Sequence, residues 1–143
     1  MGKANYWSNG LLNLLFNAAS LATVAINATS TPITAIYASL HTADPTASGA
    51  QNNNEIAYTS YARVSIARTT GGFATTTTQV IPPASAITFP AGTGGSGTAT
   101  YFGFGIGASG ATSLLYSGTV TPNIVTGNGI TPQLTTATTV TES

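Results

Sequence analysis

The sequence predicts an all-β protein, a jelly-roll-like β-sandwich of about seven to eight short strands with one N-terminal amphipathic helix. Two observations carry this prediction. From residue 31 onward, Thr, Val, Ile, Tyr and Phe dominate and Gly, Pro and Asn interrupt them at short intervals. Helical periodicity is confined to the region before that residue. The 143 residues form one domain, with an arm and helix over 1–31 and a β-sandwich over 32–143.

The helix is expected over residues 11–28, where polar and apolar residues segregate at about 100° per residue. Asn13 and Asn17 fall on one face, and Leu11 and Leu15 belong to the other. Either this helix packs across an opening of the β-fold, or its amide face contacts another subunit. The sequence leaves both open, so these four residues are candidate interface residues.

The same region of the sequence indicates where the helix starts and that it does not cross a membrane. Ser8 or Asn9 is the expected N-cap, because both side chains can accept a hydrogen bond from the first helical turn. Repeated Asn, Ser and Thr residues make 11–28 too polar for a transmembrane helix, and they argue against a secretory signal. We therefore expect no membrane partner.

The remaining chain divides into strands at its turn residues. Within the second of these strands, Ala62, Val64 and Ile66 alternate with Arg63, Ser65 and Ala67, which predicts one buried and one wetter face. The expected strands are 33–41, 56–68, 74–81, 86–89, 98–106, 112–120 and 133–141.

The chain is almost free of charge. Its six charged residues make up 4% of the sequence and sum to zero; they are Lys3, Asp44, Glu55, Arg63, Arg68 and Glu142. Three basic residues cannot neutralise several phosphates, which excludes a nucleic-acid partner. A neutral surface also lacks the repulsion that keeps monomers apart, so we expect a subunit of an assembly.

No pattern in the sequence predicts catalysis, a cofactor or a metal site. Residues 105–110 match G-x-G-x-x-G, but a strand rather than a helix follows them, so we interpret them as turn glycines. The chain has one histidine, His41, and no cysteine. A zinc site or a catalytic triad would depend on His41 with Asp44 and Glu55, which is too few ligands for a hydrolytic zinc centre.

The charged residues predict a structural ion pair instead. Arg63 and Arg68 can pair with Glu55 or Asp44, and such a bridge would hold the 42–55 loop to the sheet. The alternative is that both arginines are exposed and keep an edge strand soluble. Tyr and Phe residues also leave a glycan-binding surface as a further alternative.

Several segments resemble a known family of small tailed-phage virion proteins. They are LHTADP (40–45), E-x-x-Y-x-x-YAR (Glu55, Tyr58, Tyr61, Ala62, Arg63), ITFPAGT (87–93), TYFGFGIGASG (100–110), SLLYSG (113–118) and NGITP (128–132). Family members are often described as tail-fibre or virion structural proteins. In size and expected fold the chain is also similar to the capsid cement protein of Bordetella-type podoviruses.

The resemblance implies a non-enzymatic structural subunit of the virion and transfers no active site. Our first expectation is a cement or decoration protein on the capsid exterior, which joins neighbouring major capsid proteins and self-associates as a dimer or trimer. The alternative is a tail-fibre or tail-base component. The further alternative is a glycan-binding module of the virion.

Overall fold

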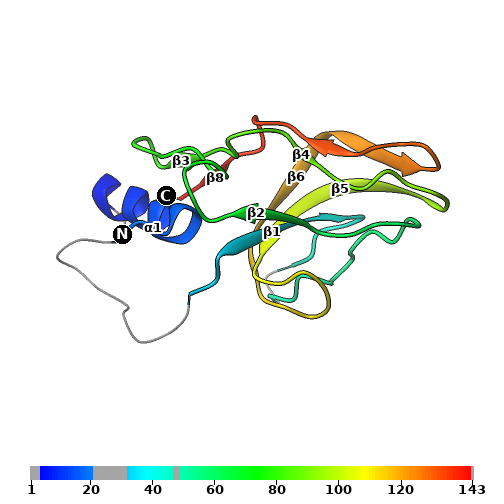
Figure 1. The fold of residues 1–143 in the computed structure, drawn as a ribbon, viewed down its shortest axis with the longest axis horizontal. Coiled ribbons are helices and arrows are strands. Elements are labelled where there is room, and N and C mark those ends of the chain that lie inside the picture. The colour runs from blue at the N-terminus through cyan, green and yellow to red at the C-terminus, as the bar shows by residue number, and fades with distance from the viewer. Residues whose placement is uncertain (1–3, 21–31, 47–48, 143) are drawn as a thin grey trace.

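The computed structural model describes residues 4–20, 32–46 and 49–142 (Figure 1). One helix and eight strands follow one another along this part of the chain. They are α1 (Asn5–Asn17), β1 (Ala35–His41), β2 (Val64–Ala67), β3 (Val80–Ile81), β4 (Ile87–Thr88), β5 (Ser96–Gly105), β6 (Leu114–Gly127), β7 (Gln133–Leu134) and β8 (Val140–Thr141). The all-β prediction with one N-terminal helix is confirmed.

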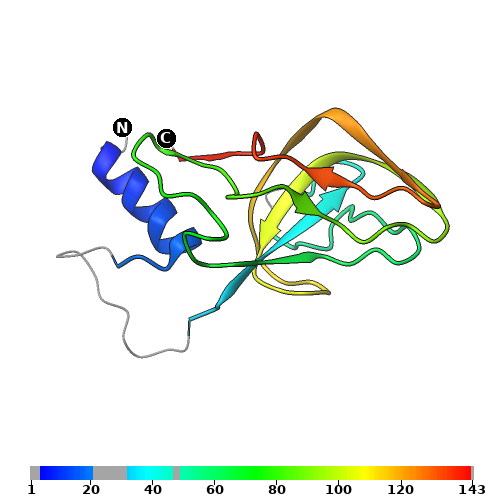
Figure 2. The same ribbon diagram turned by 45° about the horizontal axis from the view of Figure 1, so that its top comes forward.

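The strands form one four-stranded antiparallel sheet and two short ladders. The sheet has the order β2-β1-β5-β6, and the ladders pair β3 with β8 and β4 with β7. The ladders make a second layer over the sheet, as Figures 1 and 2 show. Ile81, Ile87, Leu134 and Val140 of the ladders belong to the same buried cluster as the sheet residues.

The two faces of the sheet are buried in different ways. On β1, Ile36, Ala38 and Leu40 point into the apolar core, opposite Phe102 and Phe104 of β5. The side chains between them lie on the other face, because neighbouring strand residues point in opposite directions. Segment 49–63 covers that second face, and its contacts there are polar.

Several strands are shorter than their predicted ranges. The expected strand 74–81 reduces to β3, because the Thr76 hydroxyl accepts hydrogen bonds from the main-chain nitrogens of Thr78 and Val80, both at 3.2 Å. Such local bonds compete with strand pairing. Only the last part of 56–68 pairs as β2, and 133–141 divides into β7 and β8.

Strand β6, by contrast, is longer than predicted. It continues past residue 120 to Gly127, and Pro122 lies in a part of the strand where the pairing with β5 shifts register. Ala99 pairs with Ile124 but Tyr101 pairs with Thr119, so β6 has more residues than β5 across this step. A proline without an N–H fits such a bulge at an edge strand.

Helix α1 starts earlier and ends earlier than expected. It begins at Asn5 after Ala4, rather than after Ser8 or Asn9, and it ends at Asn17 because Ala18 adopts a left-handed conformation with φ of 53°. Residues 21–28 of the predicted helix lie outside the described part of the chain. No helix in the described ranges has the length and apolar character needed to cross a membrane.

An aromatic contact joins α1 to the sheet. The centroid of the Phe16 ring lies 4.6 Å from the centroid of the Phe73 ring and 6.0 Å from that of Phe104, with edge-on geometry in both pairs. Leu12 and Phe16 are fully buried. The helix therefore shares the core of the β-fold, at one end of the molecule (Figure 2).

Candidate functional site

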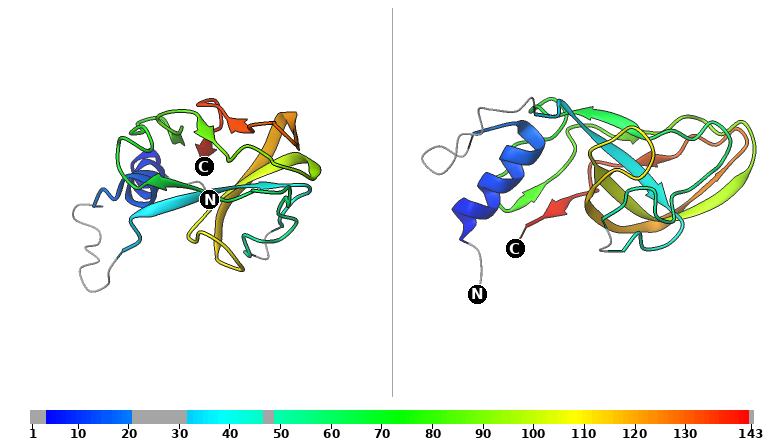
Figure 3. Two further views of the ribbon diagram at one scale, coloured as in Figure 1. Left: turned by 45° about the vertical axis from the view of Figure 1, so that its right-hand side comes forward. Right: turned by 90° about the horizontal axis from the view of Figure 1, so that it is seen from below.

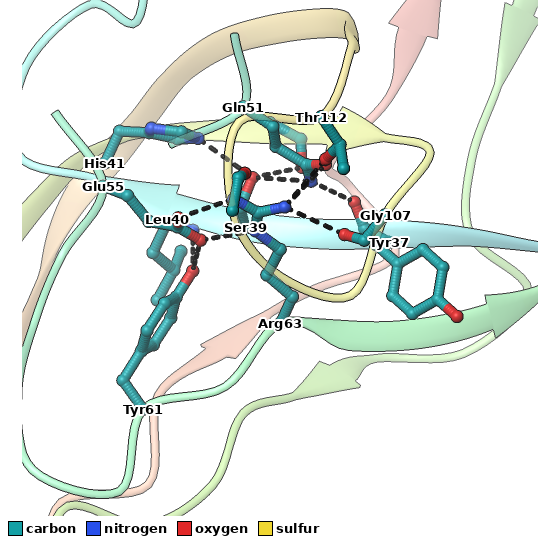
Figure 4. Close-up of polar contacts among 12 residues, drawn as sticks. Tyr37, Ser39, Leu40, His41, Gln51, Glu55, Tyr61, Arg63, Gly107 and Thr112 are labelled. Carbon is teal, nitrogen blue, oxygen red and sulfur yellow. Dashed lines mark hydrogen bonds and ion pairs between the residues drawn. The ribbon is translucent and has the colours of Figure 1, made fainter. Parts of the chain in front are cut away.

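The covered polar face of the sheet centres on Arg63, which lies just before β2. Its Nε and one terminal nitrogen each donate to a different oxygen of the Glu55 carboxylate at 2.7 Å (Figure 4). The remaining donors reach the carbonyls of Gly107 and Gly110, at 2.9 and 2.8 Å, and the hydroxyl of Thr112 at 3.0 Å. The guanidinium is buried and fully hydrogen-bonded, so it fixes the β5–β6 loop to the rest of the sheet.

The G-x-G-x-x-G run supplies two of these acceptors. Residues 105–110 start at the end of β5 and run into the loop before β6, and no helix follows them. The carbonyls of Gly107 and Gly110 accept hydrogen bonds from the Arg63 side chain of the same protein. The interpretation as turn glycines therefore agrees with the structure.

Next to Arg63, the side chains of Gln51, Ser39 and His41 form a second chain of contacts that ends on a main-chain carbonyl at each side. The amide nitrogen of Gln51 donates to the Tyr37 carbonyl at 2.8 Å and to the Ser39 hydroxyl at 3.2 Å. The Ser39 oxygen lies 2.9 Å from His41 Nε2, and His41 Nδ1 lies 2.8 Å from the Asn53 carbonyl. Because a carbonyl only accepts, Nδ1 carries the proton and Nε2 accepts from Ser39 in the neutral ring. Burial lowers the pKa of His41, which favours this neutral form.

Tyr61 closes the cluster on its other side. Its hydroxyl donates to the Glu55 carboxylate at 2.8 Å and accepts from the Leu40 main-chain nitrogen at 3.1 Å (Figure 4). Burial raises the pKa of Tyr61 well above its usual value, and the nearby Glu55 carboxylate acts in the same direction. Tyr61 therefore stays protonated and acts as a fixed donor.

Two glycines of β5 make room for these side chains. A Cβ atom at Gly105 would lie 2.2 Å from Gln51 Oε1, and one at Gly103 would lie 2.8 Å from His41 Nε2. Both glycines occupy the sheet face opposite to Phe102 and Phe104. Their missing side chains let the polar residues lie flat against the strand.

The Ser39 hydroxyl and the His41 imidazole lie inside the protein, and neither residue has exposed surface. The ring is oriented by a main-chain carbonyl, not by a carboxylate. Within the described ranges, no group of three or more His, Asp and Glu side chains could hold a metal ion.

The structure brings two of the four candidate ion-pair residues together, Glu55 and Arg63. Asp44 instead accepts from the main-chain nitrogen of Thr46 at 2.8 Å, as a turn-forming aspartate does. Arg68 is also buried, and it donates to main-chain carbonyls rather than to a carboxylate. Arg63 does not lie on a wetter strand face, because Glu55 and the β5–β6 loop enclose its guanidinium.

Arg68 stabilises the end of α1. Its three donor groups reach the carbonyls of Leu14 and Leu15, in the last helical turn, and that of Ile33 just before β1. The last carbonyls of a helix have no partner within the helix and carry partial negative charge, so an arginine there is favourable. This contact ties the helix to the start of the sheet.

The amide side chains of α1 bind the protein's own main chain. Asn13 donates to the Thr76 carbonyl and accepts from the Thr76 nitrogen, at 3.2 and 3.3 Å. Asn9 accepts from the main-chain nitrogen of Gln79 at 2.5 Å, and Asn5 accepts from the Gln79 side chain. The predicted amide face therefore packs on segment 69–79, in line with packing across the β-fold.

Asn17 continues this row at the C-terminal end of α1. With its amide nitrogen toward the main chain, Asn17 donates to the carbonyls of Phe73 and Thr69 at 2.8 and 3.1 Å. Asn5, Asn9, Asn13 and Asn17 thus recur every fourth residue on one side of the helix. Of the other two candidate interface residues, Leu15 packs against the core and Leu11 is half-buried.

A groove of about 640 Å³ lies between β6 and the C-terminal segment 133–141. Phe102 and Tyr116 contribute aromatic surface, and the Tyr116 hydroxyl donates to Glu142 at 2.9 Å. Thr is the most frequent residue type in the remaining lining, and no charged residue is among the lining residues. The groove therefore suits neutral ligands.

Comparison with known proteins gives the class of the chain. A family model of phage structural proteins matches residues 2–141, which is nearly the whole sequence. The family is described as "Podophage GP4 fiber I protein gp80", and the chain belongs to this family. No curated protein matches the chain significantly. The resemblance to phage structural proteins is thereby confirmed, whereas the capsid-cement role stays a prediction.

Proposed function

We propose that this protein is a non-enzymatic structural subunit of a podophage fibre. The observation that carries the proposal is membership of the fibre family over residues 2–141. This supports the tail-fibre alternative from the sequence better than the capsid-cement expectation. The proposed location is the virion, and the proposed partners are further copies of this chain and neighbouring virion proteins.

The arrangement of the polar cluster supports a structural role. Arg63 joins Glu55 to the β5–β6 loop, and Gln51 and His41 hold segment 49–63 against the sheet. These contacts hold the loops in one arrangement, and a loop that is already ordered loses less entropy when it contacts a neighbour. With zero net charge, contacts between subunits depend on shape and neutral hydrogen bonds.

The test is the position and copy number of the protein in an intact particle. Cryo-electron microscopy of virions with an affinity-labelled copy of this chain would locate it. We expect the label on tail-attached fibres, with a copy number that is a small multiple of the rotational symmetry of the tail. Label spread over the capsid, in numbers that match the capsid subunits, would overturn the fibre role and support the cement role.

A second candidate function, glycan binding by the virion, is favoured by the Thr-lined groove beside β6. Neutral hydroxyl-rich surfaces with aromatic walls suit uncharged sugars, because their hydroxyls pair without bringing a charge out of water. A glycan array would test it, with Tyr116→Ala as the groove variant. Binding that Tyr116→Ala leaves unchanged would contradict this location.

A further inference from the structure

Three groups that can take part in acyl transfer lie together on the covered polar face of the sheet. They are the hydroxyl of Ser39, the imidazole of His41 and the carboxamide of Gln51, and none of these residues has exposed surface. Figure 4 shows Ser39 between the other two. The Ser39 oxygen lies 2.9 Å from His41 Nε2 and 3.2 Å from the Gln51 amide nitrogen. A hydroxyl nucleophile, a base and a carbonyl group are therefore held side by side.

His41 is placed to remove the proton of Ser39. Its Nδ1 donates to the Asn53 carbonyl at 2.8 Å, so Nε2 of the neutral ring accepts from the Ser39 hydroxyl. Burial lowers the pKa of His41, which keeps the ring in the neutral form that can take up a proton. A hydroxyl in contact with a base that a third group orients is the arrangement of an activated nucleophile.

The oxygen of the Gln51 carboxamide is bound by two donors. Oε1 accepts from a terminal nitrogen of Arg63 at 3.2 Å and from the hydroxyl of Thr112 at 3.1 Å. Because a guanidinium only donates, the contact with Arg63 fixes which end of the amide is the oxygen. During attack on a carbonyl group, negative charge develops on this oxygen, and donors that already point at it stabilise that charge most effectively away from water.

Strand β5 leaves space over the atoms that would react. A Cβ atom at Gly103 would lie 2.8 Å from Ser39 Oγ and from His41 Nε2. A Cβ atom at Gly105 would lie 2.4 Å from Gln51 Cδ. A side chain at either position would therefore fill the space in which this carbon changes from planar to tetrahedral.

We propose that Ser39 and Gln51 join in an ester cross-link that the folded chain forms by itself. Ser39 Oγ attacks Gln51 Cδ, and His41 Nε2 takes the hydroxyl proton as the oxygen–carbon bond forms. The carbon–nitrogen bond of the carboxamide then breaks, and His41 gives the proton to the leaving nitrogen. The products are one ester and one ammonia, so atoms and electrons balance without a further reactant.

The positions of the groups select Ser39 over Thr112 as the nucleophile. The single histidine of the chain contacts Ser39, whereas the Thr112 hydroxyl donates to the carboxamide oxygen. Ser39 Oγ already contacts the amide nitrogen, and the carbon that it attacks is bonded to that nitrogen. A shift on the order of 1 Å brings the oxygen within attacking distance, and groups held together by one fold react as if they were highly concentrated.

The cross-link has a structural effect. Ser39 lies in β1, and Gln51 lies 12 residues further along, in segment 49–63, which covers the polar face of the sheet. The ester ties this segment to the sheet covalently, in a chain that has no cysteine for a disulfide. This inference goes beyond the proposed function and does not depend on the position of the protein in the virion.

Mass spectrometry of the purified full chain under denaturing conditions tests the proposal. After incubation of the folded protein at neutral pH, we expect a mass lower than that of the sequence by the mass of one ammonia. Ser39→Ala removes the nucleophile and should keep the full mass of its sequence. Ser117→Ala is the matched control, because Ser117 is an exposed serine of β6, and it should lose ammonia as the unsubstituted protein does.

The position of the bond distinguishes the ester from a loss of ammonia at an asparagine. A tryptic digest keeps both cross-linked residues in peptide 4–63, because neither Lys nor Arg occurs between its ends. Dilute acid then cleaves the bond between Asp44 and Pro45. We expect fragments 4–44 and 45–63 to stay linked in the unsubstituted protein and to separate after mild alkaline hydrolysis of the ester.

The rate of ammonia loss provides a second readout. Thr112→Val keeps the shape of the side chain but removes one of the two donors to the carboxamide oxygen, so we expect at least tenfold slower loss. Circular dichroism shows whether each variant is folded.

Four results would overturn the proposal. They are a chain that keeps the full mass of its sequence, an ammonia loss that persists in Ser39→Ala, a loss that maps to an asparagine, and equal rates for Thr112→Val and the unsubstituted protein. The measurements use isolated protein, so their outcome is separate from that of the fibre location.

Discussion

Arg63 shows how one residue can organise a protein with very few charges. Its guanidinium is buried, and each N–H donor has an acceptor, including both oxygens of Glu55. A buried ion pair of this kind stabilises only modestly against an apolar replacement, but removing one partner leaves the other charge buried. The residue therefore matters most for keeping the loops in one arrangement.

We predict that Arg63→Met destabilises the fold by roughly 3–5 kcal/mol, because it leaves the Glu55 carboxylate without its cationic partner and two loop carbonyls without the donors that Arg63 supplies. Arg63→Lys should recover only part of this loss, since lysine cannot form the two-point contact. Urea unfolding measures both. Asp44→Asn is the control with little effect, because its side chain still accepts from Thr46. If Arg63→Met were as stable as the unsubstituted protein, the stabilising role assigned to Arg63 would be wrong.

At Ser8 we predict that a substitution raises the stability of the fold. Its hydroxyl is buried in the helix without a hydrogen-bond partner. Ser8→Ala removes a desolvated polar group and introduces a better helix former, so we expect about 1 kcal/mol of added stability. Thermal unfolding would show a higher midpoint. A lower midpoint would mean that the hydroxyl has a stabilising contact.

At the scale of the elements, the sheet separates an apolar face from a polar one. Phe102 and Phe104 of β5 enter the core, while Gly103 and Gly105 face the polar cluster. The alternation of large and absent side chains is what allows segment 49–63 to lie against β5. Glycine, which usually weakens a strand, is here required by a close approach.

We predict that Gly105→Ala lowers stability by roughly 1–3 kcal/mol, because the new methyl would overlap Gln51 Oε1 and the Ser113 carbonyl. Gly71→Ala is the matched control. Its nearest neighbour would be Thr69 Oγ1 at 3.6 Å, an ordinary contact. Denaturant midpoints of the two variants give the comparison. A Gly105→Ala protein as stable as Gly71→Ala would show that the cluster can move aside.

On the scale of the whole molecule, stability should depend on pH through the single histidine. Burial lowers the pKa of His41 from 6.5, with Arg63 acting in the same direction and Glu55 and the Asn53 carbonyl opposing it. Below about pH 6.5 the unfolded chain binds a proton at this ring that the folded chain does not bind. Folding stability therefore falls as pH decreases from 6.5 toward the lowered pKa.

We expect the free energy of unfolding to decrease between pH 7.5 and 5.5, above the range where carboxylates titrate. His41→Gln removes the titrating group, so its stability should change much less over the same interval, whatever its absolute value. Urea titrations at several pH values measure both slopes. Parallel slopes for the two proteins would show that His41 does not carry the pH dependence.

The sequence by itself determined the class of fold and the neutral character of the surface. β-Branched and aromatic residues between Gly and Pro turns predict an all-β chain. The expected strands 33–41 and 98–106 correspond closely to β1 and β5. These features depend on local preference and composition, which a sequence shows. The sequence also shows an asparagine at every fourth residue from Asn5 to Asn17, but it does not show whether these side chains face the protein or the solvent.

Only the tertiary structure decided which groups meet and which face outward. Arg63 contacts Gly107, 44 residues away, and Asn13 contacts Thr76, 63 residues away. No local periodicity encodes such distances, so the choice of Glu55 over Asp44 and the inward turn of the asparagines stayed open. The main chain of segment 69–79 supplied donors and acceptors for the asparagines, so they face inward beside the buried Leu12 and Phe16.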